Sequence, residues 1–167
     1  MKSNFSIVVW MMVVSILLKL IVFAGNYQYT SVEQFSIFGN IFVLLTGVFL
    51  GIQQFKNRVQ TKTSFLQDVK AGMRVAALYA IFITLFVYLY YSFIDNTYFS
   101  VKLSNQIQLL EQSEEGSAAN IKKAKELGAF ILSPFFHSTV TLIGFLILGS
   151  FYAAIITFLV RKYRHER

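Results

Sequence analysis

Four polar side chains interrupt or border long apolar runs of this sequence, and they are its first candidates for chemistry: Lys19, Asn40, Asp95 and His137. An ionisable group in an apolar environment is a functional-site hypothesis because its burial is costly. Lys19, Asn40 and Asp95 could line a polar path for a solute. Asp95 and His137 could instead meet at the outer surface of a membrane enzyme.

Known catalytic patterns are missing from the sequence. It has no HExxH, GxSxG or P-loop, and no apolar run contains a pair of carboxylates. It also has no cysteine, which excludes disulfides and thiolate metal sites. We therefore predict no catalytic, cofactor-binding or metal-binding residue and expect no cofactor.

The elements that must position these residues are long apolar helices. Hydrophobic residues make up 56% of the 167 residues and charged ones only 14%. A bilayer core about 30 Å thick requires about 20 apolar helical residues, and barrel strands would be shorter and alternate in polarity. The sequence predicts an all-α polytopic membrane protein, a single membrane domain over 1–167 with four transmembrane helices, at about 5–24, 35–52, 71–94 and 136–160.

The basic residues predict the orientation of these spans. With four spans, ten of the 15 Lys and Arg residues fall on the side of the termini, and four fall in the long connection after span three. Positive residues accumulate on the cytoplasmic side, so we expect both termini in the cytoplasm of an inner-membrane protein. The net charge of +7 is explained in this way, and we expect no nucleic-acid partner.

The first span could alternatively be a signal peptide. Lys2 precedes the apolar run, and "VFAGN" would permit cleavage after Ala24. Lys19 interrupts the apolar region, however, and the run is long for a signal. We expect this span to be retained.

The long extracytoplasmic connection is expected to be helical. Leu103, Ile107 and Leu110 have helical spacing, and a break around Gly116 precedes a second periodic stretch. This pattern predicts two short amphipathic helices at about 98–131, either paired with each other or lying on the membrane. Ser133–Pro134 would then cap and open the fourth span.

Each candidate polar residue also has a structural interpretation. Lys19 could extend to the headgroups, or pair with Asp95 or Glu33 near the outer surface. Asn40 is expected to bond to another helix, and His137 to be an interfacial polar residue. Asp95 would stop the third span at the interface, beside a belt of tyrosines at headgroup level, Tyr90, Tyr91 and Tyr98.

Small residues predict the faces through which the spans pack. Small residues at four-residue spacing let two helices approach closely in lipid. Such spacing relates Gly39, Gly47 and Gly51 in the second span, and Gly149 and Ala153 in the fourth. We expect these contacts to lie within one chain.

Several of these pieces together resemble the family named domain of unknown function 4199, small four-span membrane proteins of Bacteroidetes. They are Gly51–Ile52 before a basic loop, "YYSFIDNTYF", an acidic helical segment, and "LSPFFHSTVTLIGFLILGSFYAAIITFLVRK". The resemblance begins at about Gly39. The loop "TKTSFLQDVKAG" departs from the family's pattern before span three. The resemblance implies a four-helix inner-membrane protein and brings no activity or catalytic residues.

Three functions remain open at this point. We expect a non-enzymatic accessory or scaffold protein that partners the lipid bilayer and a membrane protein or a second copy of itself. One alternative is a small transporter or channel component that uses Lys19, Asn40 and Asp95. The other is a membrane enzyme on lipid-like substrates, with Asp95 and His137 at the outer surface.

Overall fold

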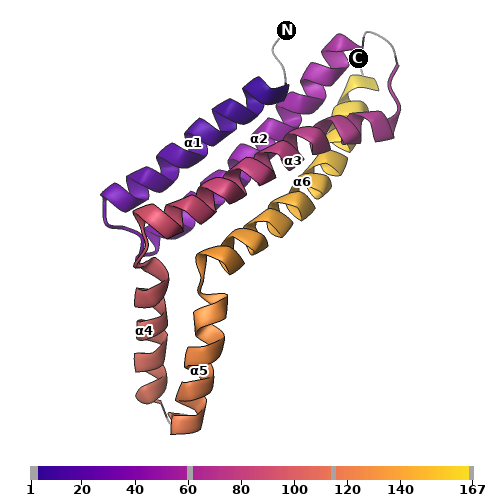
Figure 1. Cartoon of the computed structure of the whole chain (residues 1–167). Coiled ribbons are helices and arrows are strands. Elements are labelled where there is room, and N and C mark those ends of the chain that lie inside the picture. Colours follow the sequence, from indigo (N-terminus) through magenta and orange to yellow (C-terminus); the bar gives the residue numbers. More distant parts are fainter. Residues whose placement is uncertain (1–3, 60–61, 114–115, 166–167) are drawn as a thin grey trace. The chain divides into compact units, whose positions relative to one another are not determined.

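A computed structural model describes residues 4–59, 62–113 and 116–165, with side chains up to 162. These residues form helices and no strand, which confirms the predicted all-α class. The elements in chain order are α1 (Asn4–Ala24), α2 (Val32–Arg58), α3 (Phe65–Leu89), the π-helix η1 (Tyr90–Ile94), α4 (Tyr98–Glu111), α5 (Ala118–Ile131) and α6 (Pro134–His165) (Figure 1).

Four helical segments are long and apolar enough to cross a membrane, as predicted. They span Asn4–Ala24, Val32–Arg58, Phe65–Ile94 and Pro134–Lys162. Three of them extend beyond the predicted apolar stretches. Helix α2 adds a basic turn at its end, α3 begins six residues early, and α6 continues into the expected basic tail. Once a long helix is nucleated, each further residue adds one backbone hydrogen bond even if it is polar, so the helix extends beyond its apolar run.

Contacts divide the chain into two compact units. Unit 1 comprises Met1–Ile83 and Leu142–Arg167, and unit 2 comprises Thr84–Thr141. Within unit 1, α1, α2 and the adjoining parts of α3 and α6 run side by side (Figure 1). The contacts do not test whether the chain is one membrane domain, so that stays a prediction.

Glycines in α2 lie where neighbouring helices approach most closely. A Cβ built on Gly47 would lie 2.2 Å from Sδ of Met11 in α1, and one on Gly51 would lie 2.6 Å from Cγ2 of Val75 in α3. Gly39 similarly faces Leu18 of α1, at 2.9 Å. The small residues of α2 thus face two different helices of the same chain.

Helix α6 uses its small residues against α3. A Cβ on Gly149 would lie 2.4 Å from Cβ of Ala76, and one on Gly72 would lie 3.1 Å from Cβ of Ala153. Ala153 is fully buried. These contacts fix the rotation of α3, whose polar residues form the sites described below.

Unit 2 contains a helical hairpin of α4 and α5, within the segment predicted to be helical. Gly128 of α5 lies against Leu103 of α4. At the start of α6, the hydroxyl of Ser133 accepts a hydrogen bond from the backbone N–H of Phe136 at 3.2 Å, and Pro134 is the first helical residue. Which side of the membrane the hairpin faces stays a prediction.

Candidate functional site

The most highly connected polar site in unit 1 surrounds Asp68, in the first turn of α3. Its side chain is fully buried. One carboxylate oxygen, Oδ2, lies 2.8 Å from Nε of Arg161 and 3.3 Å from Nζ of Lys56. The other, Oδ1, accepts a 2.7 Å hydrogen bond from the hydroxyl of Thr63. Arg161 also donates to the backbone carbonyl of Thr63. The carboxylate thereby joins the ends of α2 and α6 to the start of α3.

Sequence reasoning missed this site. It placed Lys56 and Asp68 in the basic connection between spans two and three and Arg161 in the basic tail, and it gave none of them a partner. Arg161 is 93 residues from Asp68. The only available signal was that Asp68 is the sole acidic residue in a basic connection, where a carboxylate has several cations within reach.

A second polar site lies among the helices of unit 1. Ser15 of α1 and Tyr79 of α3 share a hydrogen bond of 2.7 Å between their hydroxyls. The Tyr79 hydroxyl also donates to Oδ1 of Asn40 in α2, at 3.4 Å. Tyr79 is fully buried and packs edge-on against Phe145 of α6. Asn40 therefore bonds to another helix, as expected, through a tyrosine that the sequence did not single out.

Lys19 is paired with Glu33. Its Nζ lies 3.3 Å from Oε1, and the two side chains are 13% and 14% exposed. Glu33 belongs to the first turn of α2, where the helix dipole favours a negative charge. Of the two partners predicted for Lys19, the structure thus gives Glu33. The pairing with Asp95, which belongs to unit 2, stays a prediction.

Asp95 lies in an aromatic cluster of unit 2. The carboxylate is 3% exposed, and its Oδ2 accepts a 3.2 Å hydrogen bond from the hydroxyl of Tyr90. Its backbone N–H bonds to the carbonyl of Tyr90 at 2.9 Å, which closes the π-helix. Asp95 therefore does end the third span, but as a buried residue.

The three tyrosines of the expected belt do not expose their rings to lipid headgroups, and their level in the membrane stays a prediction. Tyr90, Tyr91 and Tyr98 are 1%, 3% and 3% exposed, so their rings pack inward. The wide turn of a π-helix shifts the direction of the side chains that follow it, which a helical period of 3.6 does not anticipate.

His137 joins the same cluster from the first turn of α6. Its ring lies 5.2 Å from that of Tyr91 and 5.5 Å from that of Phe99, measured between centroids. Tyr91 in turn packs on Tyr90 at 4.9 Å. Asp95 and His137 thus belong to one cluster. Among the residues that the structure describes, no three His, Cys, Asp or Glu side chains group as metal ligands would.

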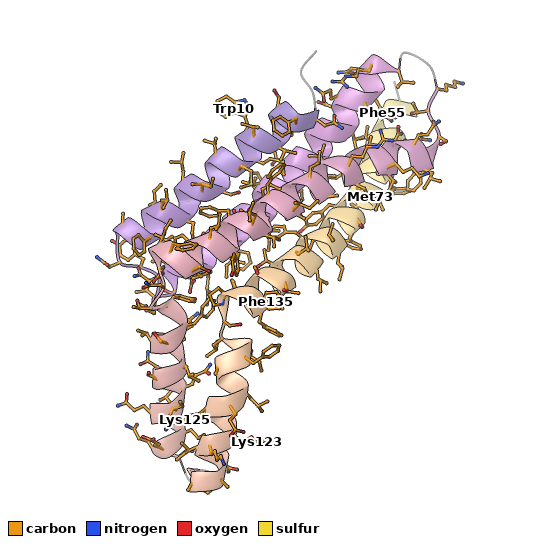
Figure 2. All side chains as sticks on the ribbon, viewed as in Figure 1. Trp10, Phe55, Met73, Lys123, Lys125 and Phe135 are labelled. Carbon is orange, nitrogen blue, oxygen red and sulfur yellow. The ribbon has the colours of Figure 1, made fainter. Side chains whose placement is uncertain are left out.

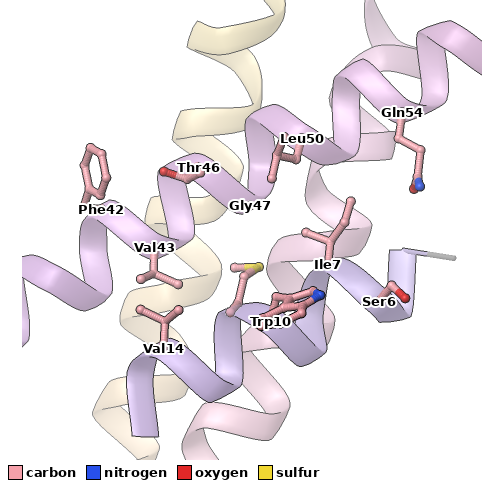
Figure 3. A pocket seen from close by; sticks show the side chains of 11 residues that line it. Ser6, Ile7, Trp10, Val14, Phe42, Val43, Thr46, Gly47, Leu50 and Gln54 are labelled. Atoms are coloured by element: carbon pink, nitrogen blue, oxygen red, sulfur yellow. The ribbon is translucent and has the colours of Figure 1, made fainter. Parts of the chain in front are cut away.

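A groove of about 450 Å³ lies between α1 and α2 in unit 1 (Figure 3). It is lined chiefly by apolar side chains, with Ser6, Thr46 and Gln54 as its polar members. None of Lys19, Asn40, Asp95 and His137 lines it. It is therefore separate from the polar sites described above.

Comparison with known proteins identifies the family of this chain. No curated protein and no solved structure matches it. A family model, described as "Protein of unknown function (DUF4199)", matches residues 6–162. This region covers nearly the whole chain, including all four spans except the first two residues of the first, so the protein belongs to this family of unknown function, as the resemblance of its sequence predicted.

Proposed function

We propose that this integral membrane protein is a non-enzymatic accessory or scaffold protein of the inner membrane, with both termini in the cytoplasm. The observation that carries the proposal is the full pairing of the buried Asp68 carboxylate of unit 1 with protein donors. The distribution of Lys and Arg along the sequence supports the orientation.

The pairing of the Asp68 carboxylate supports a structural role over a catalytic one. A general base or an ion ligand needs a lone pair that a substrate can reach. Both oxygens of Asp68 are occupied by protein donors, and the side chain is fully buried. Such an arrangement ties helix ends together, which suits a rigid support for a partner.

The exposed surface of α5 supports a partner-binding role. No residue of α5 is buried, although the helix is amphipathic. Leu127, Phe130 and Ile131 are 52%, 61% and 48% exposed, while Lys123 and Lys125 occupy an earlier turn (Figure 2). Exposed apolar side chains on an amphipathic helix favour contact with a protein or a lipid surface.

Site-specific photo-crosslinking tests this proposal. A photoreactive phenylalanine analogue at Phe130 should give one discrete protein adduct in native membranes, and the same analogue at the exposed Lys122 should not. A stoichiometric partner should then co-purify in mild detergent. Lipid adducts alone at Phe130, with only the monomer recovered after purification, would contradict the proposal.

A second candidate function is a small transporter or channel component. It is favoured by the polar group of Ser15, Asn40 and Tyr79, which come from three helices of one unit. A path through this group would admit water. Because the chain has no cysteine, Ser15→Cys would be the single target of a water-soluble thiol reagent.

The two candidates predict opposite outcomes of that labelling. A scaffold whose Ser15 is 1% exposed should leave the new thiol unmodified until the protein is denatured. Rapid modification of the folded protein would favour the transporter. Ser104→Cys in α4, at an exposed position, is the positive control for reactivity.

A further inference from the structure

The groove between α1 and α2 combines an apolar body with an open rim. Trp10 and Phe42 stand at the rim and are 71% and 69% exposed, whereas Gly47 forms part of the floor. Figure 2 shows Trp10 on the side of α1 away from the other helices. All three residues lie within spans, so the groove opens toward the hydrocarbon of the bilayer. Its volume of about 450 Å³ falls within the range of small-molecule sites.

One end of the groove is polar and leads to a cation. Gln54 and Ser6 line that end, on α2 and α1 respectively. Arg58 follows Leu50 and Gln54 at four-residue steps, so the three side chains share one face of α2. Arg58 is exposed and belongs to the last turn of the helix, beyond the apolar part of the span. The groove thus runs from an apolar interior toward a positive charge at headgroup level.

We propose that this groove is a binding site for an anionic phospholipid. One acyl chain would lie along the apolar body, beside Val14, Val43 and Leu50, and the phosphate would lie near Arg58. The charge at the polar end complements a phosphate, and juxtamembrane cations attract anionic lipids. The site is independent of the scaffold role proposed above, since it uses neither α4 nor α5.

A second copy of the chain fits this groove less well. A helix with its side chains is about 10 Å across, and Met11 of the same chain already packs on Gly47 in the groove. Two copies share one orientation in a membrane, so a dimer through this face would bring the two Arg58 ends together. Like charges that face each other across an interface disfavour association.

Trp10 provides a direct test because it is the only tryptophan of the chain. Full-length protein is reconstituted into phosphatidylcholine vesicles that contain an equal, low mole fraction of dibrominated phosphatidylglycerol or dibrominated phosphatidylcholine. Bromine quenches tryptophan on contact. We expect the quenching to indicate an enrichment of about fivefold for the anionic lipid, the effect of one cation at a membrane surface.

Variants separate the groove from general attraction to a basic protein. Arg58→Gln should abolish the preference, while Lys123→Gln, which removes the same charge from α5, should retain it. Thr46→Phe should fill the groove and remove the preference while the helical content stays unchanged.

Two results would overturn the proposal. One is equal quenching by both lipids in the unmodified protein, or an anionic preference that survives Arg58→Gln. The other is a Trp10 shielded from both lipids in a protein that crosslinks as a dimer through α1, which would assign the groove to a second copy.

Discussion

Replacing Asp68 with asparagine tests the role of the buried carboxylate most directly. The amide keeps an oxygen for the Thr63 hydroxyl but leaves Lys56 and Arg161 without a negative partner. Removing one member of a fully buried ion pair destabilises a protein by about 3–5 kcal/mol. Lys56 and Arg161 are 9% and 27% exposed, so water screens part of this loss. We therefore expect a destabilisation of about 3 kcal/mol for Asp68→Asn, at the lower end of that range.

A double-mutant cycle makes the measurement specific. Unfolding in mixed micelles of increasing sodium dodecyl sulfate is followed by far-ultraviolet circular dichroism for the unmodified protein, Asp68→Asn, Arg161→Gln and the double variant. We expect the two single changes to be non-additive by at least about 1 kcal/mol, because the residues share one contact. Lys70→Gln, at an exposed position two residues away, is the matched control and should unfold like the unmodified protein.

The reasoning would be refuted by additivity. If the destabilisation of the double variant equalled the sum of the destabilisations of the two single variants, Asp68 and Arg161 would not interact in the folded protein. A loss below about 0.5 kcal/mol for Asp68→Asn would equally show that the cluster is exposed and screened, since surface changes have effects of this size.

Three further predictions concern the packing, the hydroxyl group in unit 1 and the topology. Gly47→Leu should destabilise the same unfolding transition by about 1–3 kcal/mol through overpacking against a methionine of α1. Gly144→Leu, at a glycine where an added Cβ would meet no atom within 4 Å, should leave the stability unchanged. Tyr79→Phe should lower the free energy of unfolding by about 1 kcal/mol in that assay, because it removes the hydroxyl that bonds to α1 and α2. An unchanged unfolding midpoint would contradict these hydrogen bonds. An impermeant maleimide should label Ser104→Cys in intact cells but label Lys62→Cys only after permeabilisation, and the reverse pattern would overturn the orientation.

Hydropathy alone was sufficient to predict the spans. Each apolar run falls within the range of about 17–25 residues that a bilayer requires, so its existence as a helix follows from length and composition. The ends were less predictable. Residues 65–70 include Gln67, Asp68 and Lys70 and were assigned to a connection, yet they form the first turns of α3 because their backbone bonds continue those of the apolar part.

Most of the polar contacts between helices could not be predicted, because they depend on the rotation of each helix about its axis, which a single sequence does not specify. Asn40 was singled out because an amide in an apolar run needs a partner, but Tyr79 was counted among the hydrophobic residues. Asp68 and Arg161 each lie beyond a predicted apolar run, and hydropathy gave neither residue a partner. Their pairing depends on two helices that extend past the hydrocarbon and on their relative rotation.

The order of synthesis gives the Asp68 site a further consequence. The ribosome makes Arg161 93 residues after Asp68, an interval of about 5–20 s at ordinary rates of translation. During this interval, Lys56 is the only one of the two cations already present in the chain. A nascent chain that lacks the end of its last helix therefore carries an incompletely neutralised carboxylate, a feature for a membrane protease to recognise. Pulse–chase labelling of chains ended after Ser150 should show rapid degradation, and Asp68→Asn should prolong their lifetime; an equal lifetime for both would remove this role in quality control.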